Sequence, residues 1–287
     1  MRFRAWHGAC PESGNRPYRR FPENSPSDDA KEHCMNLHPR LATGLIAALL
    51  MLGTSHATAH SNETPTYGSI DRLDLTLLLP APPTLDSPEQ KAEVEAILAA
   101  QKAAGAERIA QAVKDAKGTV FDMFGQVLGA HFTAAELPAT ARLFARLGNS
   151  EAAVVEAAQN VFDRKRPFAA DGRVQVLPQA SMMSVEMAKS QGENLPTKGS
   201  WPSSRAARVT ASAIVMSEIV PERKSELWSR AREYAESRVI AGMHYPQDLE
   251  MGYRAGTALA ALLQADAEFK AEFAAARQET RTALGLK

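Results

Sequence analysis

Residues 237–248 read SRVIAGMHYPQD, and this stretch is typical of the end of one helix, a turn and the start of a new helix. Apolar residues recur three or four apart on both sides of it, which predicts helices over 222–240 and 247–264. Gly242 permits the chain to turn, and Pro246 suits the first position of the second helix. The stretch therefore predicts two helices that meet at a sharp turn.

The same helical spacing fills most of the remaining chain. Ser87 can cap the first of these helices, and Gly105 predicts a break within it. A short alternating run at 173–177 is too little to make a sheet. We expect an all-α, single-domain helical bundle, with further helices over 88–117, 134–147, 150–164, 180–190, 204–218 and 266–283.

The N-terminal part divides by composition into three segments. Residues 1–34 are rich in Arg, Pro and Ser and fit no targeting pattern, so we interpret them as a misassigned start or a disordered extension. Residues 35–59 have a basic start, a short apolar run and an A-x-A site, which predicts a signal peptide cleaved near Ala59. Residues 60–87 are predicted to form an irregular Pro-rich arm before a helical domain over 88–287.

Charge and residue usage exclude several classes of protein. The formal net charge of the 287 residues is +0, and no basic cluster follows the first twenty residues, so nucleic acid is a poor partner. The apolar run of the signal segment is too short to span a bilayer, so no stable membrane insertion is expected after cleavage. Cys10 and Cys34 precede the expected domain, and its few histidines exclude a multi-histidine metal site.

The turn at 237–248 carries residues that suit chemistry at phosphorus. His244 and Asp248 are four residues apart, so the carboxylate can hold one imidazole nitrogen while the other faces a substrate. The dipole of the helix that starts at Pro246 favours an anion beside His244. The plainer alternative is that Arg238 and Asp248 form a surface ion pair and His244 only fills the turn.

Two further clusters of residues are candidates for binding an anion. Arg166, beside Pro167, could grip a phosphoryl group with its planar guanidinium, although basic residues at a helix C-terminus are common for dipole reasons. The amides of Ser203 and Ser204, in the loop 199–205, could cradle oxyanions, although Ser203 could equally be an ordinary helix cap.

In this order the clusters resemble the class A bacterial non-specific acid phosphatases, within the superfamily of type 2 phosphatidic acid phosphatases and vanadium haloperoxidases. The resemblance runs from about Leu77 to the C-terminus. It includes LLLPAPP at 77–83, RKRPF at 164–168, the Pro-Ser pair at 202–203 and the S-R-x5-H-x3-D pattern from Ser237 to Asp248. The last pattern is the most specific, and the fold it implies is the helical bundle of this superfamily.

The resemblance implies a division of roles. His244 would attack phosphorus and form a phosphohistidine, and Asp248 would orient it. Arg166, Arg238 and the amides around Ser203 and Ser204 would hold the phosphoryl oxygens. Two arginines can neutralise these oxygens without a metal, so no cofactor is expected, and vanadate is expected to inhibit as a mimic of phosphate.

Two positions depart from the family pattern. A lysine stands seven residues before the arginine of the family's Arg-Pro pair, where this chain has Gln159. The family loop reads Pro-Ser-Gly-His and its histidine protonates the leaving group, whereas this chain places Arg205 at that position. Arginine is not a proton donor near neutral pH. Lys198 is a candidate for the missing charge and His131 for the missing acid, although His131 is better explained as an ordinary surface or half-buried residue.

The leading hypothesis is an exported, periplasmic or secreted acid phosphatase that hydrolyses small phosphate monoesters with weakened or narrowed activity. Gln159 and Arg205 favour the alternative of a non-catalytic phosphate-binding protein on the same scaffold. Vanadate-dependent oxidation or phosphotransfer in the same pocket is a third hypothesis. The sequence leaves open the physiological substrate, the group that replaces the acid, and whether the protein forms a homo-oligomer.

Overall fold

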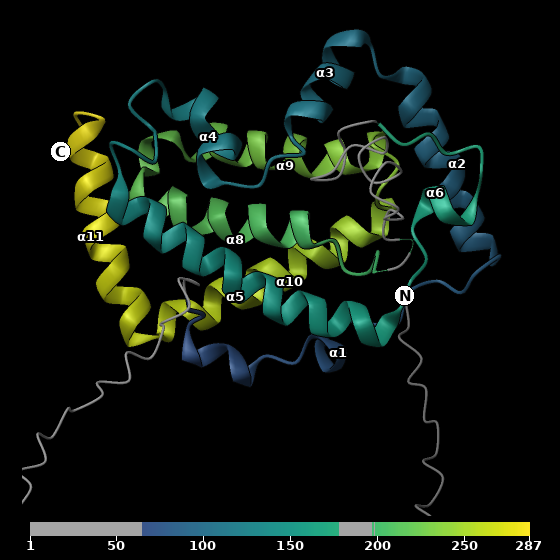
Figure 1. Cartoon of the computed structure of the whole chain (residues 1–287), viewed down its shortest axis with the longest axis horizontal. Helices are drawn as coiled ribbons and strands as arrows, with labels where there is room; N and C mark the ends of the chain where they lie inside the picture. The colour runs from purple at the N-terminus through teal and green to yellow at the C-terminus, as the bar shows by residue number, and fades with distance from the viewer. Residues whose placement is uncertain (1–64, 178–196, 198) are drawn as a thin grey trace, which may run out of the picture. The chain divides into compact units, whose positions relative to one another are not determined.

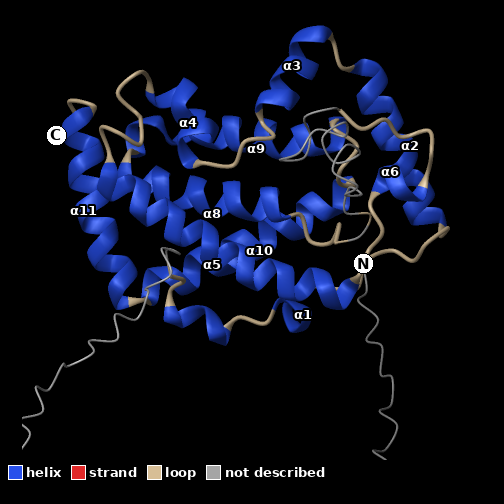
Figure 2. Ribbon diagram, in the orientation of Figure 1, coloured by secondary structure: helices blue, strands red, loops and turns tan. Residues whose placement is uncertain are grey.

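The computed structural model of the chain describes residues 65–177, 197 and 199–287. Over these ranges all regular structure is helical and no strand occurs (Figure 2). The all-α prediction is confirmed, and residues 173–177 lie in turns and loop. The signal segment 35–59, the extension 1–34 and the helix predicted over 180–190 lie outside the described residues.

A central helix, α8 (Ser204–Ile219), organises the domain. It packs against α5 (Pro138–Phe162), α9 (Lys224–Ile240) and α10 (Pro246–Ala265), which surround it in Figure 1. Most α8 side chains are buried and small, including a run of alanines and valines. Because burial of apolar surface drives packing, this helix forms the middle of the core.

Two glycines set the distance between α8 and α10. A Cβ atom on Gly252 would lie 2.6 Å from the carbonyl oxygen of Ser203, and one on Gly256 would lie 2.2 Å from the carbonyl oxygen of Ala207. Only glycine allows the helices to touch backbone to backbone here. The contact brings the start of α8 onto the start of α10, where the amide of Ser203 donates to the carbonyl oxygen of Asp248 at 2.9 Å.

The first two helices after Ser87 lie where the sequence predicted them. Ser87 caps α2 (Pro88–Ala103) by accepting from the amide of Gln90, and α3 (Ala106–Lys114) begins directly after Gly105. The predicted cap and break are therefore confirmed. The sequence did not predict α4 (Val120–Leu128), which has a capping box between Thr119 and Asp122.

The prediction of two helices over 134–147 and 150–164 is wrong, because α5 runs without a break from Pro138 to Phe162. Gly148 lies inside it, where a Cβ would make only an ordinary contact with Cζ of Arg208 at 3.6 Å. Helix packing outweighs the low helix propensity of one glycine. The helix ends at Asp163, which has a left-handed φ of 47°.

Shorter elements cover the ends of the bundle. The chain before α2 contains the 3₁₀ helix η1 (Gly68–Arg72) and α1 (Leu75–Leu78), and α1 packs on α5. The indole of Trp201 donates to the carbonyl oxygen of Pro80 at 3.1 Å, which ties this N-terminal segment to the loop before α8. The remaining elements are α6 (Pro167–Ala170), η2 (Pro221–Arg223) and α11 (Ala267–Ala283). No described helix is long and apolar enough to cross a membrane.

Candidate active site

His244 lies in the turn between α9 and α10, as the sequence predicted. Gly242 makes the turn with a φ of +73°, and a Cβ on it would lie 2.2 Å from the carbonyl oxygen of Gln175. The amide of Met243 donates to the carbonyl oxygen of Arg238 at 3.0 Å and so closes the turn onto α9. His244 is 3% exposed, which is too buried for a residue that only fills a surface turn.

The partners of the His244 ring fix its tautomer. Nε2 lies 3.1 Å from Nη1 of Arg166, which can only donate, so Nε2 must accept. The proton therefore sits on Nδ1, which donates to the carbonyl oxygen of Ser200 at 2.9 Å. Burial, followed by the charges of Arg166 and Arg238, outweighs Asp248 and lowers the pKa of His244 to about 4. The imidazole is neutral above this pH, with its free lone pair on Nε2.

Asp248 is fully buried at the first turn of α10 and joins four groups. Its Oδ1 accepts from Arg164 at 2.5 Å, and its Oδ2 accepts from the Ser200 hydroxyl at 2.5 Å and the Tyr245 amide at 2.7 Å. Nδ1 of His244 lies 3.5 Å from the same Oδ2. Asp248 thus orients His244 mainly through Ser200, whose carbonyl oxygen is the nearer acceptor.

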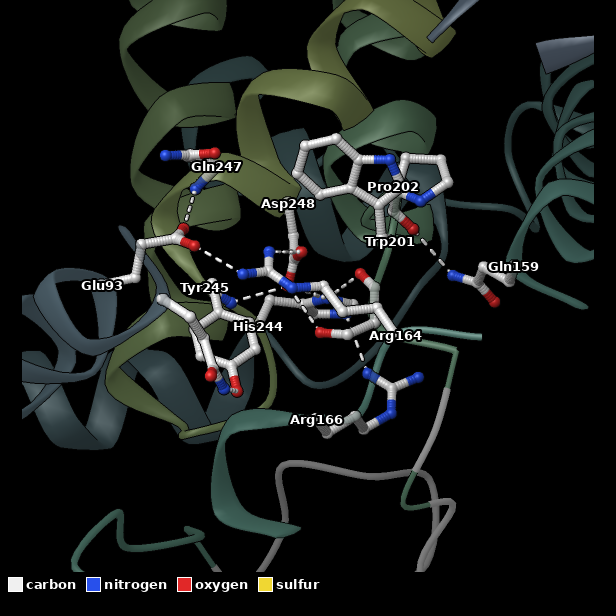
Figure 3. Close-up of polar contacts among 12 residues, drawn as sticks. Glu93, Gln159, Arg164, Arg166, Trp201, Pro202, His244, Tyr245, Gln247 and Asp248 are labelled. Atoms are coloured by element: carbon white, nitrogen blue, oxygen red, sulfur yellow. Dashed lines mark hydrogen bonds and ion pairs between the residues drawn. The ribbon is translucent and has the colours of Figure 1, made fainter. Parts of the chain in front are cut away.

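Behind Asp248 lies a buried ion-pair network drawn in Figure 3. Arg164 binds Asp248 with one nitrogen and Glu93 of α2 with another, at 2.5 Å each. The other oxygen of Glu93 accepts from the amide of Gln247 at 2.9 Å. The Arg164 guanidinium also stacks over the ring of Tyr245, 3.9 Å from its centroid. The network fixes the start of α10, and with it the position of Asp248.

Arg166 and Arg238 approach His244 from different elements. Arg166 precedes the four-residue helix α6 and donates to the carbonyl oxygens of Met243 and Gly199, at 3.1 Å each. Arg238 is 3% exposed near the end of α9, and burial, followed by the charge of Arg205, lowers its pKa to about 9. Both guanidinium groups therefore stay charged at acidic and neutral pH beside one buried imidazole.

Gln159 of α5 binds the loop that precedes α8. The side-chain amide of Gln159 donates to the carbonyl oxygen of Pro202 at 2.8 Å (Figure 3). Ser203 caps α8 by accepting from the amide of Ala206 at 3.3 Å, which is the plainer of its two expected roles. Because the amide of Ser203 already donates to Asp248, it fixes the loop on α10 instead of facing a ligand.

Arg205 is half-buried on the first turn of α8. Its Nη1 lies 3.4 Å from the hydroxyl oxygen of Tyr234, which in turn donates to the carbonyl oxygen of Lys117. Burial raises the pKa of Tyr234, so this phenol remains neutral and does not cancel the charge of Arg205. The chain thus has a cation where a proton donor is expected.

The two residues suggested as replacements do not join the site. Lys198 lies outside the described residues. The side chain of His131 is 72% exposed and pairs with Glu136 at 2.9 Å, in the segment between α4 and α5. His131 is an ordinary surface residue, as its sequence context favoured.

A cavity of about 520 Å³ opens beside these groups. Its walls include Gln159, Arg166, Gly199 and Ser204, together with Thr197. A cavity of this size with a guanidinium in its wall can admit a phosphate and part of an ester. In the described part of the chain, no group of three or more His, Cys, Asp or Glu residues could hold a metal ion.

Sequence reasoning missed Arg164, Glu93 and Ser200 as parts of the site. Arg164 stood in the quoted motif without a role, and Ser200 acts through its backbone carbonyl as well as its hydroxyl. Glu93 shares the buried face of α2 with Gln90, Val94 and Ile97. A carboxylate on the apolar face of an amphipathic helix was the available signal for a buried partner.

Comparison with known proteins agrees with this geometry. The chain is 27% identical over 246 residues to an acid phosphatase of Zymomonas mobilis, covering 85% of this chain and 88% of that protein. It is 29% identical over 227 residues to a non-specific acid phosphatase of Salmonella typhimurium, covering 77% and 86%. A non-specific acid phosphatase of Providencia stuartii is 28% identical over 211 residues, covering 72% and 81%. Residues 141–270, which include the three clusters that the sequence predicted to bind an anion, match the PAP2 superfamily model, so this part of the chain is a PAP2 superfamily domain.

Proposed function

We propose that this protein is a metal-independent acid phosphatase that hydrolyses phosphate monoesters through a phosphohistidine at Nε2 of His244. The observation that carries the proposal is the buried, neutral imidazole of His244, with its proton held on Nδ1 by Ser200 and its lone pair beside Arg166. A histidine activated in this way is a competent nucleophile. The acid phosphatases among its relatives support the same activity.

In the first step the Nε2 lone pair attacks phosphorus, and the bond from phosphorus to the ester oxygen breaks. The phosphoryl group displaces Arg166 from Nε2 and takes its guanidinium as a partner instead. The positive charge that develops on the imidazole lies beside Asp248, whose Oδ2 is 3.5 Å from Nδ1. Because Asp248 is held in place by Arg164, Ser200 and Tyr245, this stabilisation needs little rearrangement.

In the second step a water molecule attacks phosphorus, the bond to Nε2 breaks, and the proton that the water gives up passes to solvent, which supplies the proton that the departed ester oxygen takes up. The imidazole regains its lone pair, and inorganic phosphate leaves. Arg166 and Arg238 neutralise the equatorial oxygens in both steps, which is the main demand of phosphoryl transfer. A phosphate or vanadate ion would occupy the same position, so vanadate should compete with substrate.

The leaving oxygen finds no histidine at the expected acid position. Loss of general acid catalysis costs about 10² to 10⁴ in rate. Esters of acidic alcohols and phenols need the least help, so we propose that activity is strongest on good leaving groups. Gln159, which binds the loop at Pro202, is a second departure, since it brings no positive charge to the phosphate.

A non-catalytic phosphate-binding protein is the alternative that these two substitutions favour. Arg166 and Arg238 would bind the anion, and Arg205 would add a third cation. We favour turnover because His244 and Asp248 both remain, whereas phosphate binding alone needs neither a neutral imidazole nor a network that orients it. We also propose export to the periplasm or medium, with cleavage near Ala59, on the basis of the signal pattern at 35–59.

The first experiment follows p-nitrophenol release from p-nitrophenyl phosphate between pH 4 and 8, with EDTA present, by the chain from His60 onward. His244→Ala is expected to lower turnover by about 10⁴ or more, because the nucleophile is lost. Unchanged thermal unfolding of the variant would exclude misfolding as the cause. Phosphate binding with no turnover above the variant would instead support the binding protein.

A further inference from the structure

A second cavity, of about 530 Å³, adjoins the cavity that Arg166 lines and has no role in the steps above. Its lining residues come from α4, α5 and α8 and from the segments that flank α4. Ser204 lines both cavities, so they share a wall at the first turn of α8. Its volume falls in the range of about 300–1,000 Å³ that small-molecule sites occupy.

The walls of this cavity are mostly apolar. Val120, Phe121 and Met123 come from α4, and Phe144 comes from α5. Phe121 packs on Phe132 with ring centroids 4.8 Å apart, which holds the aromatic wall in place. Walls of this kind favour an aromatic ring or a short aliphatic body over a hydrated polar chain.

Two arginines stand on the α8 side of the cavity. Arg208 binds the buried carboxylate of Glu151 at 2.8 Å. Arg205 has the neutral hydroxyl of Tyr234 at 3.4 Å as its hydrogen-bond partner and also attracts the Glu151 carboxylate. Two guanidinium groups thus share one buried carboxylate, which leaves one net positive charge at the wall of a largely apolar space.

Gly118 makes the position of Arg205 possible. A Cβ on Gly118 would lie 2.1 Å from Nη1 of Arg205, so any other residue would push the guanidinium aside. Arg205 also repels Arg238, since its charge is the second cause of the lowered pKa of Arg238. Arg205 thus stands between the phosphate-binding arginines and the apolar cavity, and an anion beside it would relieve that repulsion.

We propose that this cavity binds the leaving group, and that the preferred substrates are phosphate monoesters whose apolar body carries a second anionic group bound by Arg205. The inference rests on the proposed phosphatase function. It gives Arg205 a role in specificity in place of the proton donor that the family has there. The second anion is recognised by charge, so a carboxylate or a further phosphate would both serve.

The test compares 4-carboxyphenyl phosphate with 4-carbamoylphenyl phosphate, which have nearly the same shape and differ in one negative charge. The neutral amide withdraws more electrons, so leaving-group chemistry alone would favour the amide ester. At pH 7 the full chain is expected to show kcat/KM about tenfold higher for the carboxylate, as a hydrogen-bonded charge pair provides. The ratio should fall to one or below in Arg205→Gln, where leaving-group chemistry alone remains, and persist in Arg205→Lys.

Phe121→Ala is the matched control for the apolar wall. It should lower kcat/KM for both esters by a similar factor and leave the ratio of the two values unchanged, because it removes packing and no charge. A ratio near one in the unaltered protein, or the same ratio in Arg205→Gln, would overturn the proposal.

A binding measurement separates failure of this inference from failure of the proposed function. Calorimetry with 4-carboxybenzylphosphonate and 4-carbamoylbenzylphosphonate needs no turnover, and the carboxylate should bind about tenfold more tightly. Tighter binding of the carboxylate without hydrolysis of any ester would refute the proposed phosphatase activity and support the proposed anion site at Arg205. Hydrolysis with equal binding of the two phosphonates would refute the anion site and support the phosphatase activity.

Discussion

The two sides of the proposed phosphate site are built differently. On the nucleophile side, His244 and Asp248 are buried and tied by short hydrogen bonds to Ser200, Tyr245 and Arg164. On the opposite side, Arg205 is half-buried and has a single long hydrogen bond to Tyr234. The nucleophile side keeps the pattern expected of the family, whereas the other side departs from it.

This difference indicates which side of the site can accept substitutions. Removing any partner of Asp248 would strand a buried charge, so the nucleophile side tolerates little change. Arg205 borders a cavity, and the Tyr234 hydroxyl that it contacts also donates to the carbonyl oxygen of Lys117, so this hydroxyl keeps a partner when Arg205 is replaced. Substrate preference can therefore change at Arg205 while the attack on phosphorus stays the same.

The largest effect is expected from Arg205→His, which places an imidazole at the family's acid position. It should raise kcat/KM by about 10² to 10⁴ for an alkyl phosphate such as glycerol phosphate, because a poor leaving group needs a proton. p-Nitrophenyl phosphate should gain much less. Arg205→Gln is the control without an acid, and an equal gain in that variant would contradict the account.

The buried network of the nucleophile side should also contribute more to the free energy of unfolding than an exposed ion pair does. Substitution of one buried and one exposed arginine compares the two. Arg164→Met leaves Asp248 and Glu93 buried without their partner and should cost about 3–5 kcal/mol of unfolding free energy. Arg173 also binds two carboxylates, but its side chain is 59% exposed. Arg173→Met should therefore leave the free energy of unfolding almost unchanged. Chemical denaturation gives both values, and similar losses would disprove the contrast.

The smallest effect is the acid limb of the pH profile. The pKa of His244 is lowered from 6.5 to about 4, so the imidazole should stay unprotonated as the pH falls to that value. Below it, kcat/KM should drop about tenfold per pH unit, because the protonated ring has no lone pair to attack phosphorus. A loss that begins between pH 7 and 6 would show that His244 titrates normally. Arg205→His should add a second ionisation to the profile.

The sequence predicted the features that depend on neighbouring residues. The turn at Gly242, the helix start at Pro246 and the cap at Ser87 are local, and local chemistry determines them. The continuous α5 was missed because packing on α8 and α11 outweighs its weak centre around Gly148. Helix propensity alone cannot show that this packing keeps α5 continuous.

The buried network could not be predicted, because its members are far apart in the chain. Arg164 lies 71 residues from Glu93 and 84 from Asp248. Its pairing depends on how α2 and α10 meet, which no local pattern encodes. Likewise, the space for Arg205 depends on Gly118, a residue in the loop between α3 and α4 with no motif of its own.

The central claim is a covalent phosphohistidine at His244, and trapping it is the most direct test. The enzyme is mixed with excess p-nitrophenyl phosphate, quenched in alkali within milliseconds, digested and examined by mass spectrometry. The account predicts one added phosphoryl group on His244, in the tryptic peptide 239–254, and none in the His244→Ala variant. Turnover with the phosphoryl group on Ser203 or Ser204, or with no covalent intermediate at all, would contradict it.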